Sequence, residues 1–595
     1  MQLKNCLRAR FNQRNARFFS NWKVDSWSGE VKLSKGGPVY QVIVGLEIHA
    51  QLNIRDKLFS PAISSGMYGQ SSSIYPFDVA VPGKLPLLSA EAVQKAVLVA
   101  AALQCDIHTT SRFERKHYTY ADLPLSYQIT QQRWPLAENG LLECSYLSTP
   151  KNKLNDGQFA RSTGKFDSKQ SICCRIQRVQ LEQDTGKTTS TTRSQICSNG
   201  STESDLSAAT IKTTYSLVDF SRAGCALVEI VTAPDLRSSL QAASVVHSLR
   251  HLLRFTGTCL GRMEDGNLRV DCNVNLQNEQ QRRTPRIEIK NLNSIQQVRD
   301  AIEYEAVRQA ENFENLVGGV EETRTWDVLK RKTTLIRTKD QAIDYRFLPE
   351  PDLPPLVLNG HVLGVPTIKQ FVLRNSPELP ALAEQRLRST YQLSEYHAHV
   401  IARDPAAIRL FEEAMHFVNY SSLDTQPSLA SKTTANLLCN DLFSLVKKAA
   451  ERQAHAFILD DDDEVVSMSH AKINGSQLGE IATMILQERI SSTMAKKLLA
   501  LLFTDECADR NPSDLAHDQG FRLITDQEEL RELCRAILRD HPEEIEVYKR
   551  GGKFIQKMNK LFTGKAMSLS NGNAHPERLQ DALCDVLNDV APGIK

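Results

Sequence analysis

The strongest constraint on this chain is an apolar segment, residues 39–52, that carries a glutamate and a histidine two residues apart. Its β-branched and aliphatic residues predict a strand, and side chains on a strand alternate between two faces. Glu47 and His49 therefore share one face with Gly45, while the aliphatic residues between them point the other way. A carboxylate and an imidazole at this spacing can hold a cation or a proton, and the glycine lets a ligand or another backbone approach.

Other apolar segments carry charged or polar residues in the same way. An unpaired ionised carboxylate inside such a strand costs several kcal/mol or shifts its pKa, so each one needs a cation or hydrogen-bond donors. A structural salt bridge, an acidic turn or a solvated strand face would explain each segment on its own. The segments are 176–187 with Glu182, Gln183 and Asp184; 226–231 with Glu229; 264–273 with Arg269, Asp271 and Asn273; and 286–291 with Arg286, Glu288 and Lys290.

Taken together, these segments predict one sheet with acidic and basic groups on a concave face. Carboxylates would hold Mg²⁺, and Arg and Lys side chains would bind the oxygens of a transferring phosphoryl group. The sequence contains no G-x-x-x-x-G-K-[ST] loop and no kinase signature, so an ATP site here is of another type. The residues alone predict metal-dependent phosphoryl or acyl chemistry and do not indicate a substrate.

Length and composition set further limits. A chain of 595 residues is too long for one hydrophobic core, so about two to four domains are expected. A net charge of +2 means that any nucleic-acid surface must be a local patch. No run of about 18 apolar residues appears, which argues against a membrane span. The 13 cysteines show no C-x-x-C spacing, which favours reduced thiols in an intracellular compartment.

The chain changes character near residue 352, from short alternating strands to helical periods. Within the first part, Ser238 and Ser294 each precede a glutamine by three residues, which predicts capped helices. Two polar segments, 151–170 and 188–213, are predicted to be surface insertions with no core to bury.

The first 37 residues are predicted to be a mitochondrial transit peptide and a disordered arm. Basic and apolar residues are interspersed there without an acid before Asp25, as in targeting peptides. A disordered arm that binds nucleic acid is the alternative. The basic residues are Lys4, Arg8, Arg10, Arg14, Arg17 and Lys23.

Several longer motifs give the chain a resemblance to a known family, the B subunits of aspartyl/glutamyl-tRNA amidotransferases in their mitochondrial form. The resemblance covers roughly residue 39 to the C-terminus and is weaker in the helical half. The motifs are Val44-Gly45-Leu46-Glu47-Ile48-His49, Arg115-Lys116-His117-Tyr118-Thr119-Tyr120-Ala121-Asp122-Leu123-Pro124, Tyr127-Gln128-Ile129, Glu138-Asn139-Gly140, Asp219-x-x-Arg222-Ala223-Gly224, Leu227-Val228-Glu229-Ile230-Val231, Lys290-Asn291-Leu292-Asn293-Ser294 and Asp344-Tyr345-Arg346-Phe347-Leu348-Pro349-Glu350-Pro351-Asp352.

The resemblance implies an α+β fold: a glutamine-synthetase-like β-rich cradle over 38–352, a helical domain over 353–472 and a small YqeY-like helical tail over 473–595. It also implies repair of Glu-tRNA(Gln) in the mitochondrial matrix. ATP and Mg²⁺ would phosphorylate the γ-carboxylate of the misacylated glutamate. Ammonia, released from glutamine by an amidase-type A subunit, would then displace phosphate; a small C subunit would complete the complex.

By the same resemblance, the site residues divide into two sets. Catalytic roles fall on Glu47, His49, Glu229, Arg269 and Lys290, and the metal would be held by Glu47, His49, Glu182, Gln183 and Glu229. The chain departs from the family at Gln183, where bacterial members carry a second glutamate, so either Glu182 or Asp184 would take its duty or the site is weaker. A second departure lies between Phe59 and Pro82, where serines replace the zinc-binding cysteines of some members, and no zinc is expected.

A basic stretch near the end is the expected tRNA-binding surface, because clustered cations release counterions from phosphates. A solvated helix face is the alternative. The residues are Lys549, Arg550, Lys553, Lys557, Lys560 and Lys565. For the whole chain, the competing hypothesis is a scaffold that binds tRNA and partners while its own metal site has decayed, and Gln183 is the residue that favours it.

Overall fold

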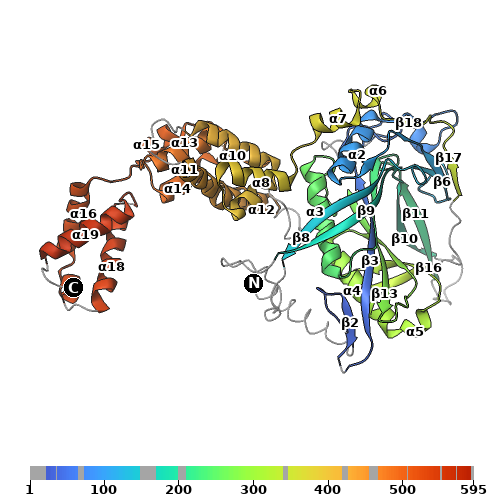
Figure 1. Cartoon of the computed structure of the whole chain (residues 1–595), viewed down its shortest axis with the longest axis horizontal. Helices are drawn as coiled ribbons and strands as arrows, with labels where there is room; N and C mark the ends of the chain where they lie inside the picture. The colour runs from blue at the N-terminus through green and yellow to red at the C-terminus, as the bar shows by residue number, and fades with distance from the viewer. Residues whose placement is uncertain are drawn as a thin grey trace, which may run out of the picture. The chain divides into compact units, whose positions relative to one another are not determined.

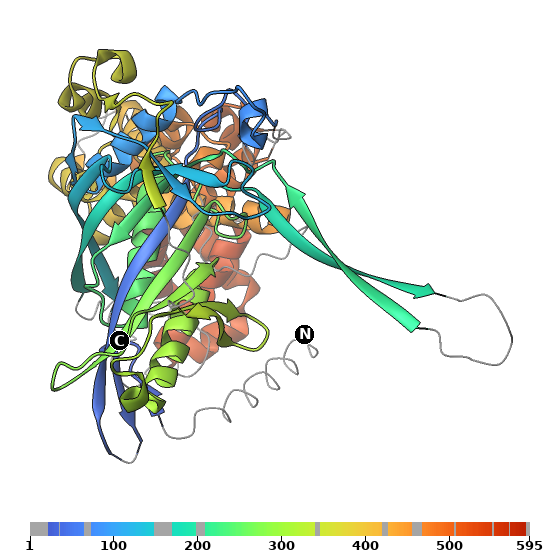
Figure 2. The same cartoon turned by 90° about the vertical axis from the view of Figure 1, so that its right-hand side faces the viewer.

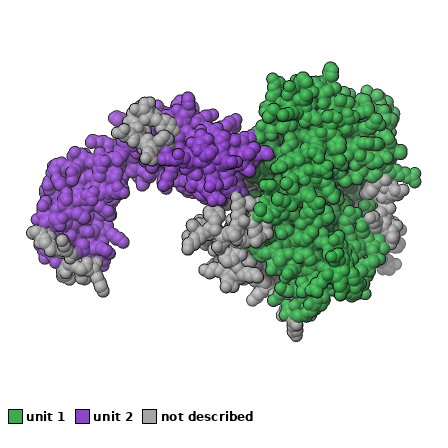
Figure 3. Space-filling model, in the orientation of Figure 1, with its two compact units in different colours: residues 1–377 green, residues 378–595 purple. Residues whose placement is uncertain are grey.

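The computed structural model divides the chain into two compact units, residues 1–377 and 378–595 (Figure 3). The expected α+β class is confirmed, because the first unit is built around a large sheet and the second is helical. The expected boundaries at 352 and 472 divide the chain differently and stay predictions. The structure describes residues 22–34, 36–64, 73–147, 169–197, 209–338, 346–418, 427–454, 467–504, 507–549, 553–570 and 572–590.

An 11-stranded sheet organises the first unit (Figure 1). Its order is β16-β15-β14-β13-β3-β12-β9-β8-β4, with β2 added to β3 and β1 added to β2. All pairs are antiparallel except β14 with β15. The strands are β1 (Trp22–Val24), β2 (Glu30–Leu33), β3 (Val39–Gln51), β4 (Asp106–Ile107), β8 (Ala137–Leu147), β9 (Lys169–Gln183), β12 (Ala226–Thr232), β13 (Leu268–Asn278), β14 (Ile287–Leu292), β15 (Glu322–Asp327) and β16 (Lys332–Thr338).

Two helices, α3 (Ser239–Phe255) and α4 (Ile295–Glu311), pack against each other and the sheet. The predicted caps are confirmed: the side chains of Ser238 and Ser294 accept hydrogen bonds from the backbone N–H three residues later. The apolar side chains of β3, Leu46, Ile48 and Ala50, are fully buried. Burial of this face leaves the other face of β3 to the polar residues.

Smaller elements complete the first unit. A three-stranded sheet has the order β17-β6-β7, and β5 pairs with β18. Helix α2 contacts β4 and β9, and α6 and α7 contact α2. The elements are β5 (Thr110–Ser111), β6 (Glu114–His117), β7 (Tyr127–Thr130), β17 (Arg346–Pro349), β18 (Leu356–Val357), the 3-10 helix η2 (Pro76–Val79), α2 (Ala90–Ala102), α5 (Phe313–Leu316), α6 (Gly360–Leu363) and α7 (Ile368–Asn375).

A long β-hairpin, β10 (Lys187–Cys197) and β11 (Ala209–Asp219), runs out from this unit, as Figure 2 shows in blue-green. Where the structure describes it, the predicted surface insertion over 188–213 is this paired hairpin. Its many threonines favour extended backbone, and the two strands pair from Lys187 opposite Asp219 to Cys197 opposite Ala209. The other expected insertion, 151–170, lies almost wholly outside the described residues.

Part of the expected N-terminal arm is also ordered. Strands β1 and β2 pair with each other, and β2 pairs with β3. Val31 is fully buried, and the ring of Trp22 lies 5.7 Å from that of Tyr40. The prediction of disorder was wrong here, because a short apolar alternation follows the basic segment. Residues 1–21, on which the targeting prediction depends, lie outside the described residues.

The second unit consists of helices. Helix α10 packs on α13. Gly479 of α13 lies close to α10, and a Cβ added at this glycine would be 2.5 Å from the carbonyl oxygen of Ala414. A π-helical segment, η5 (Leu437–Leu442), lies between α11 and α12. The helices are α8 (Pro380–Tyr391), α9 (Glu395–Ala402), α10 (Pro405–Phe417), α11 (Pro427–Asn436), α12 (Phe443–Ala454), the 3-10 helix η6 (Met468–His470), α13 (Gly475–Leu486), α14 (Ser492–Leu502), α15 (Pro512–Asp518), α16 (Gln527–Asp540), α17 (Pro542–Tyr548), α18 (Lys553–Leu569) and α19 (Pro576–Val590).

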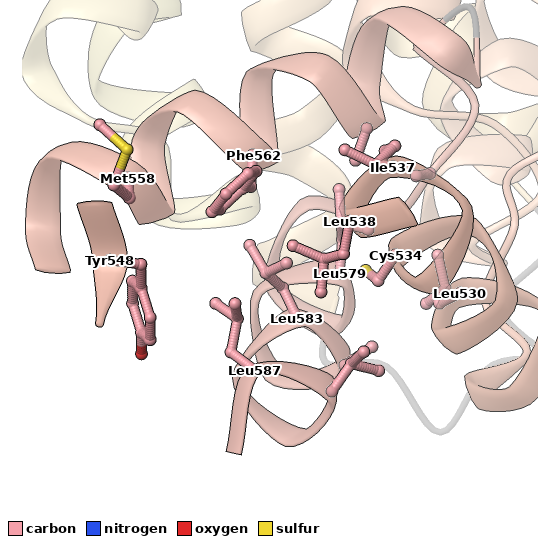
Figure 4. Packing of buried hydrophobic residues seen from close by; sticks show 14 residues of the cluster. Leu530, Cys534, Ile537, Leu538, Tyr548, Met558, Phe562, Leu579, Leu583 and Leu587 are labelled. Atoms are coloured by element: carbon pink, nitrogen blue, oxygen red, sulfur yellow. The ribbon is translucent and has the colours of Figure 1, made fainter. Parts of the chain in front are cut away.

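The last four helices enclose their own hydrophobic core (Figure 4). Leu530, Phe562 and Leu579, from α16, α18 and α19, are fully buried in it. Tyr548 is also part of this core. In the part of the chain that the structure describes, no helix combines the length and the apolar character needed to cross a membrane.

Removal of the N-terminal strands should destabilise the first unit. A chain that begins at residue 22, the first described residue, is the reference. A chain that begins at residue 39 loses the burial of Val31 and the pairing of β2, so its free energy of unfolding should fall by at least about 2 kcal/mol. Thermal unfolding of the two chains measures this, and equal midpoints would contradict it.

Candidate functional site

Strand pairing gathers the predicted polar residues on one face of the sheet. His49 lies opposite Glu229 of β12 on one side and opposite Arg269 of β13 on the other. Two residues earlier, Glu47 lies opposite Asp271. Residues in register on neighbouring strands point to the same face, so these side chains share one face of the sheet, as the sequence predicted.

Three of these side chains form a compact group with metal-ligand character: His49, Glu182 and Glu229. The Nε2 of His49 lies 3.6 Å from Glu182 Oε1 and 4.0 Å from Glu229 Oε2. Both carboxylates are buried, and Glu182 Oε2 has no hydrogen-bond partner among the described residues. Two buried carboxylates and an imidazole, with an acceptor left unpartnered, fit a divalent cation.

The electrostatics of this group also favour a bound cation. Burial and the neighbouring charge of Glu182 raise the pKa of Glu229 to about 7. Burial also acts to raise the pKa of Glu182, but the nearby charges of Lys116 and His49 outweigh it and lower that pKa below the usual range. Two carboxylates this close cannot both stay ionised without compensation, so the group binds either a proton or a cation.

Two buried glutamines hold these carboxylates, and the sequence prediction missed both. Gln180 Nε2 donates to Glu229 Oε2 at 2.7 Å, and Gln128 Nε2 donates to Glu182 Oε1 at 2.8 Å. The hydroxyl of Tyr118 donates in turn to Gln128 Oε1 at 2.9 Å. Alternation along the strand places Gln180 on the same face as Glu182, two residues later, and this pattern could have predicted its role. Gln128 was named only as part of a longer motif.

Glu47 belongs to a second acidic group, with Asp271 and Glu288. Asn273 Nδ2 donates to Glu47 Oε1 at 3.0 Å. The ammonium of Lys290 already lies 3.1 Å from Asp271 and 2.5 Å from Glu288, and their charges, against the opposing effect of burial, raise the pKa of Lys290. A metal ion here would have to displace or compete with that lysine, so the group of His49 is the better candidate.

The structure does not bring Gln183 together with the other expected ligands. Gln180 and Glu182 share one face of β9, so alternation places Gln183 on the opposite face, where its buried Oε1 has no partner among the described residues. Asp184 is also committed elsewhere: it accepts from Arg269 Nη2 at 2.9 Å and lies 3.3 Å from Arg222 Nε. Of the residues proposed for this duty, Glu182 alone stands with His49 and Glu229.

A loop next to the site depends on a glycine and a buried ion pair. Gly224 has a φ of 85°, donates to the carbonyl oxygen of Asp184 at 2.9 Å, and would place a Cβ 2.7 Å from Asp78 Oδ1. Asp78 is paired with the fully buried ammonium of Lys57 at 3.1 Å. Glycine is therefore required in the predicted Asp219-x-x-Arg222-Ala223-Gly224 motif, both for its backbone conformation and for this contact.

The basic residues of the tail do not form one free cluster. Lys549 is paired with Glu546 at 2.7 Å and Lys565 with Glu544 at 3.1 Å. Lys557 and Lys560 on α18 are exposed and have no ion-pair partner in the described part of the chain. The remaining two positions, Arg550 and the side chain of Lys553, lie outside the described residues.

Comparison with known proteins covers both units. Two family models match, the GatB/GatE catalytic domain over residues 42–363 and the GatB domain over residues 425–587. The mitochondrial B subunit of the glutamyl-tRNA(Gln) amidotransferase of Phytophthora infestans is 33% identical over 93% of this chain and 96% of its own length. The chloroplastic/mitochondrial B subunit of Ostreococcus tauri is 34% identical over 93% and 94%. The aspartyl/glutamyl-tRNA(Asn/Gln) amidotransferase B subunit of Rickettsia felis is 31% identical over 92% and 98%.

The raised pKa of Glu229 predicts a pH-dependent effect of Glu229→Gln on stability. Between pH 4.5, the ordinary pKa of glutamate, and about 7, the unfolded chain loses this proton before the folded chain does. The contribution of Glu229 to the free energy of unfolding of the wild type therefore falls over this window, and the amide variant escapes that loss. The melting temperature of the variant minus that of the wild type should therefore be larger at pH 8 than at pH 5. Both are measured in a chelating buffer. A difference that does not change with pH would contradict the assignment.

Proposed function

The chain belongs to the family of B subunits of tRNA-dependent amidotransferases, and on that premise we propose that it converts Glu-tRNA(Gln) to Gln-tRNA(Gln) in mitochondria. The resemblance stated from its motifs is confirmed at the level of the family. Relatives named as mitochondrial and as chloroplastic/mitochondrial proteins support an organellar role, and the basic N-terminal segment supports the matrix. The designation of these relatives as B subunits supports assembly with an amidase-type A subunit and a small C subunit.

The proposed reaction has two steps. An oxygen of the γ-carboxylate attacks the γ-phosphorus of ATP, the bond to the β,γ-bridging oxygen breaks, and ADP leaves. Ammonia, made from glutamine by the partner subunit, then attacks the activated carbonyl carbon. Phosphate leaves, the nitrogen loses a proton, and the amide of glutamine remains on the tRNA.

The observation that carries this proposal is the buried group of His49, Glu182 and Glu229. These residues would hold Mg²⁺, which when bound compensates the negative charge of phosphoryl oxygens. Gln128 and Gln180 orient the two carboxylates by hydrogen bonds from their amides. The carboxylates of Glu182 and Glu229 are buried, and a site that excludes water would protect an acyl phosphate from hydrolysis.

The other expected catalytic residues act around this group. Arg269 is fixed by Asp184, and Lys290 is fixed by Asp271 and Glu288. Both cations are therefore held in place on the face, and the paired carboxylates largely balance their charge. Glu47, a member of the second acidic group, accepts a hydrogen bond from Asn273 and stands two residues before His49 on β3.

The scaffold hypothesis rested on Gln183. Because Gln183 lies off the face that carries His49, Glu182 and Glu229, its amide removes no charge from that group. This supports the enzyme over the scaffold, and the two differ in what substitution of Glu229 should do.

Substitution of Glu229 should abolish amidation and leave tRNA binding intact. In a complex reconstituted with the A and C subunits, Glu-tRNA(Gln), glutamine, ATP and Mg²⁺, Glu229→Gln and Glu229→Ala should lower the rate of Gln-tRNA(Gln) formation roughly 100-fold or more. The amino acid released from the tRNA by mild base measures this. Glu143→Gln, at an exposed position of β8, is the matched control and should act as the wild type. Full amidation by both Glu229 variants would favour the scaffold.

The exposed lysines of α18 should contribute to tRNA binding more than the paired ones. The double change Lys557→Gln/Lys560→Gln should weaken tRNA binding and lower the slope of log K against log salt by about 1 to 2. Lys565→Gln, which removes a lysine already paired with Glu544, should change the slope less. Filter binding over a salt series measures both. Equal slopes for the double variant and the wild type would exclude this face of α18 from the tRNA interface.

A further inference from the structure

One cation on the polar face of the sheet is not accounted for by the site described above. Arg178 stands on β9 two residues before Gln180, and its side chain therefore shares the face that carries Gln180 and Glu182. It is partly buried, and its Nε is fully buried. Among the described residues, its guanidinium has no hydrogen-bond or ion-pair partner.

The sheet offers Arg178 a carboxylate that it does not use. Glu138 lies directly opposite on β8, where a cross-strand ion pair is expected. The carboxylate of Glu138 instead lies 3.3 Å from His108 Nε2. On the other side, the register neighbour is Val231, which has no polar side-chain atom, and Glu47 follows only on the next strand.

This contrasts with the other cations of the face. Arg269 is paired with Asp184, and Lys290 with Asp271 and Glu288. Those pairs leave little positive charge for an incoming anion. An unpaired guanidinium that has lost part of its hydration is unfavourable unless an anion meets it, and its fork of N–H donors matches phosphate oxygens.

We propose that Arg178 binds a phosphoryl oxyanion on this face of the sheet, beside the group of His49, Glu182 and Glu229. Arg178 is suitably placed for this role, because it lies two residues, about 6.7 Å, along β9 from Gln180, whose amide donates to Glu229. Its guanidinium would supply the positive charge and the N–H donors that bind a phosphoryl group there. The identity of the anion rests on the proposed function: it is either a phosphate of ATP or a backbone phosphate of the tRNA acceptor end.

The test is binding by Arg178→Gln and Arg178→Lys in the full chain with its partner subunits. The probes are the non-hydrolysable β,γ-methylene analogue of ATP with Mg²⁺, and Glu-tRNA(Gln). Loss of a charge-assisted hydrogen-bonding group should weaken the relevant ligand at least about tenfold in Arg178→Gln, and less in Arg178→Lys. Arg175→Gln is the matched control, since Arg175 lies on the same strand, is largely exposed and is paired with Asp235.

The two sources of phosphate give different patterns. Weaker binding of the nucleotide analogue alone assigns Arg178 to ATP, and weaker binding of the tRNA alone assigns it to the acceptor end. Unchanged binding of both ligands in Arg178→Gln would overturn the proposal. Thermal stability should not fall in Arg178→Gln, because the side chain has no partner to lose; a loss larger than that of Arg175→Gln would point to a structural role instead.

A third probe separates this proposal from the proposed function. If the wild type bound neither ligand, the amidotransferase role would fail, but a phosphoryl site would still be testable with pyrophosphate and Mg²⁺. Pyrophosphate should raise the melting temperature of the wild type and of Arg175→Gln, and raise it less in Arg178→Gln. Equal shifts in all three would exclude Arg178 as an anion-binding residue.

Discussion

The site depends on the backbone pairing of one strand. β3 runs for 13 residues between β12 and β13, and its hydrogen bonds fix which residue of each neighbour stands beside Glu47 and His49. A shift of one residue would move every polar side chain to the face that now packs on helices, where ionised groups would be buried without partners. The fully buried Leu46, Ile48 and Ala50 exclude that shift. The same alternation that builds the hydrophobic core therefore also aligns the acids of the site.

The distribution of charge on this face follows from how each group is compensated. The acidic group around Glu47 contains its own lysine, and Asp184 holds two arginines, so these regions are nearly neutral. The group of His49, Glu182 and Glu229 contains two carboxylates and a single imidazole. The guanidinium of Arg178 has no ion-pair partner in the part of the chain that the structure describes. The two carboxylates thus lack a compensating positive charge, and Arg178 lacks a compensating negative charge, on the same face of the sheet. A metal ion and a phosphoryl group together would correct both.

Much of this could be predicted from the sequence because the relevant patterns are local. Period-two alternation assigned Glu47 and His49, and Arg269 and Asp271, to single faces, and capping residues located α3 and α4. Strand order and register are not local, so the division of the acids into two groups, and the loss of Gln183 from the ligand face, could not be foreseen. Neutral side chains such as Gln128 give no signal of a role until their partners are known. At Trp22 to Leu33 the apolar alternation is short and directly follows a basic segment, so its strands were not predicted. In the tail, the core residues Tyr548 and Phe562 lie among the basic residues of the predicted tRNA-binding stretch.

The hairpin of β10 and β11 has a consequence for how this chain tolerates change. Among the described residues, it is joined to the rest of the first unit at its root, where Gly186 donates to the carbonyl oxygen of Asp122 and Arg222 binds the carbonyl oxygens of Thr185 and Gly186. Beyond Lys187 and Asp219 its two strands pair only with each other. Insertions or deletions made in matched pairs along the two strands would therefore change its reach by about 3.4 Å for each pair and leave the root in place. The length of this hairpin can therefore change without loss of the contacts at its root.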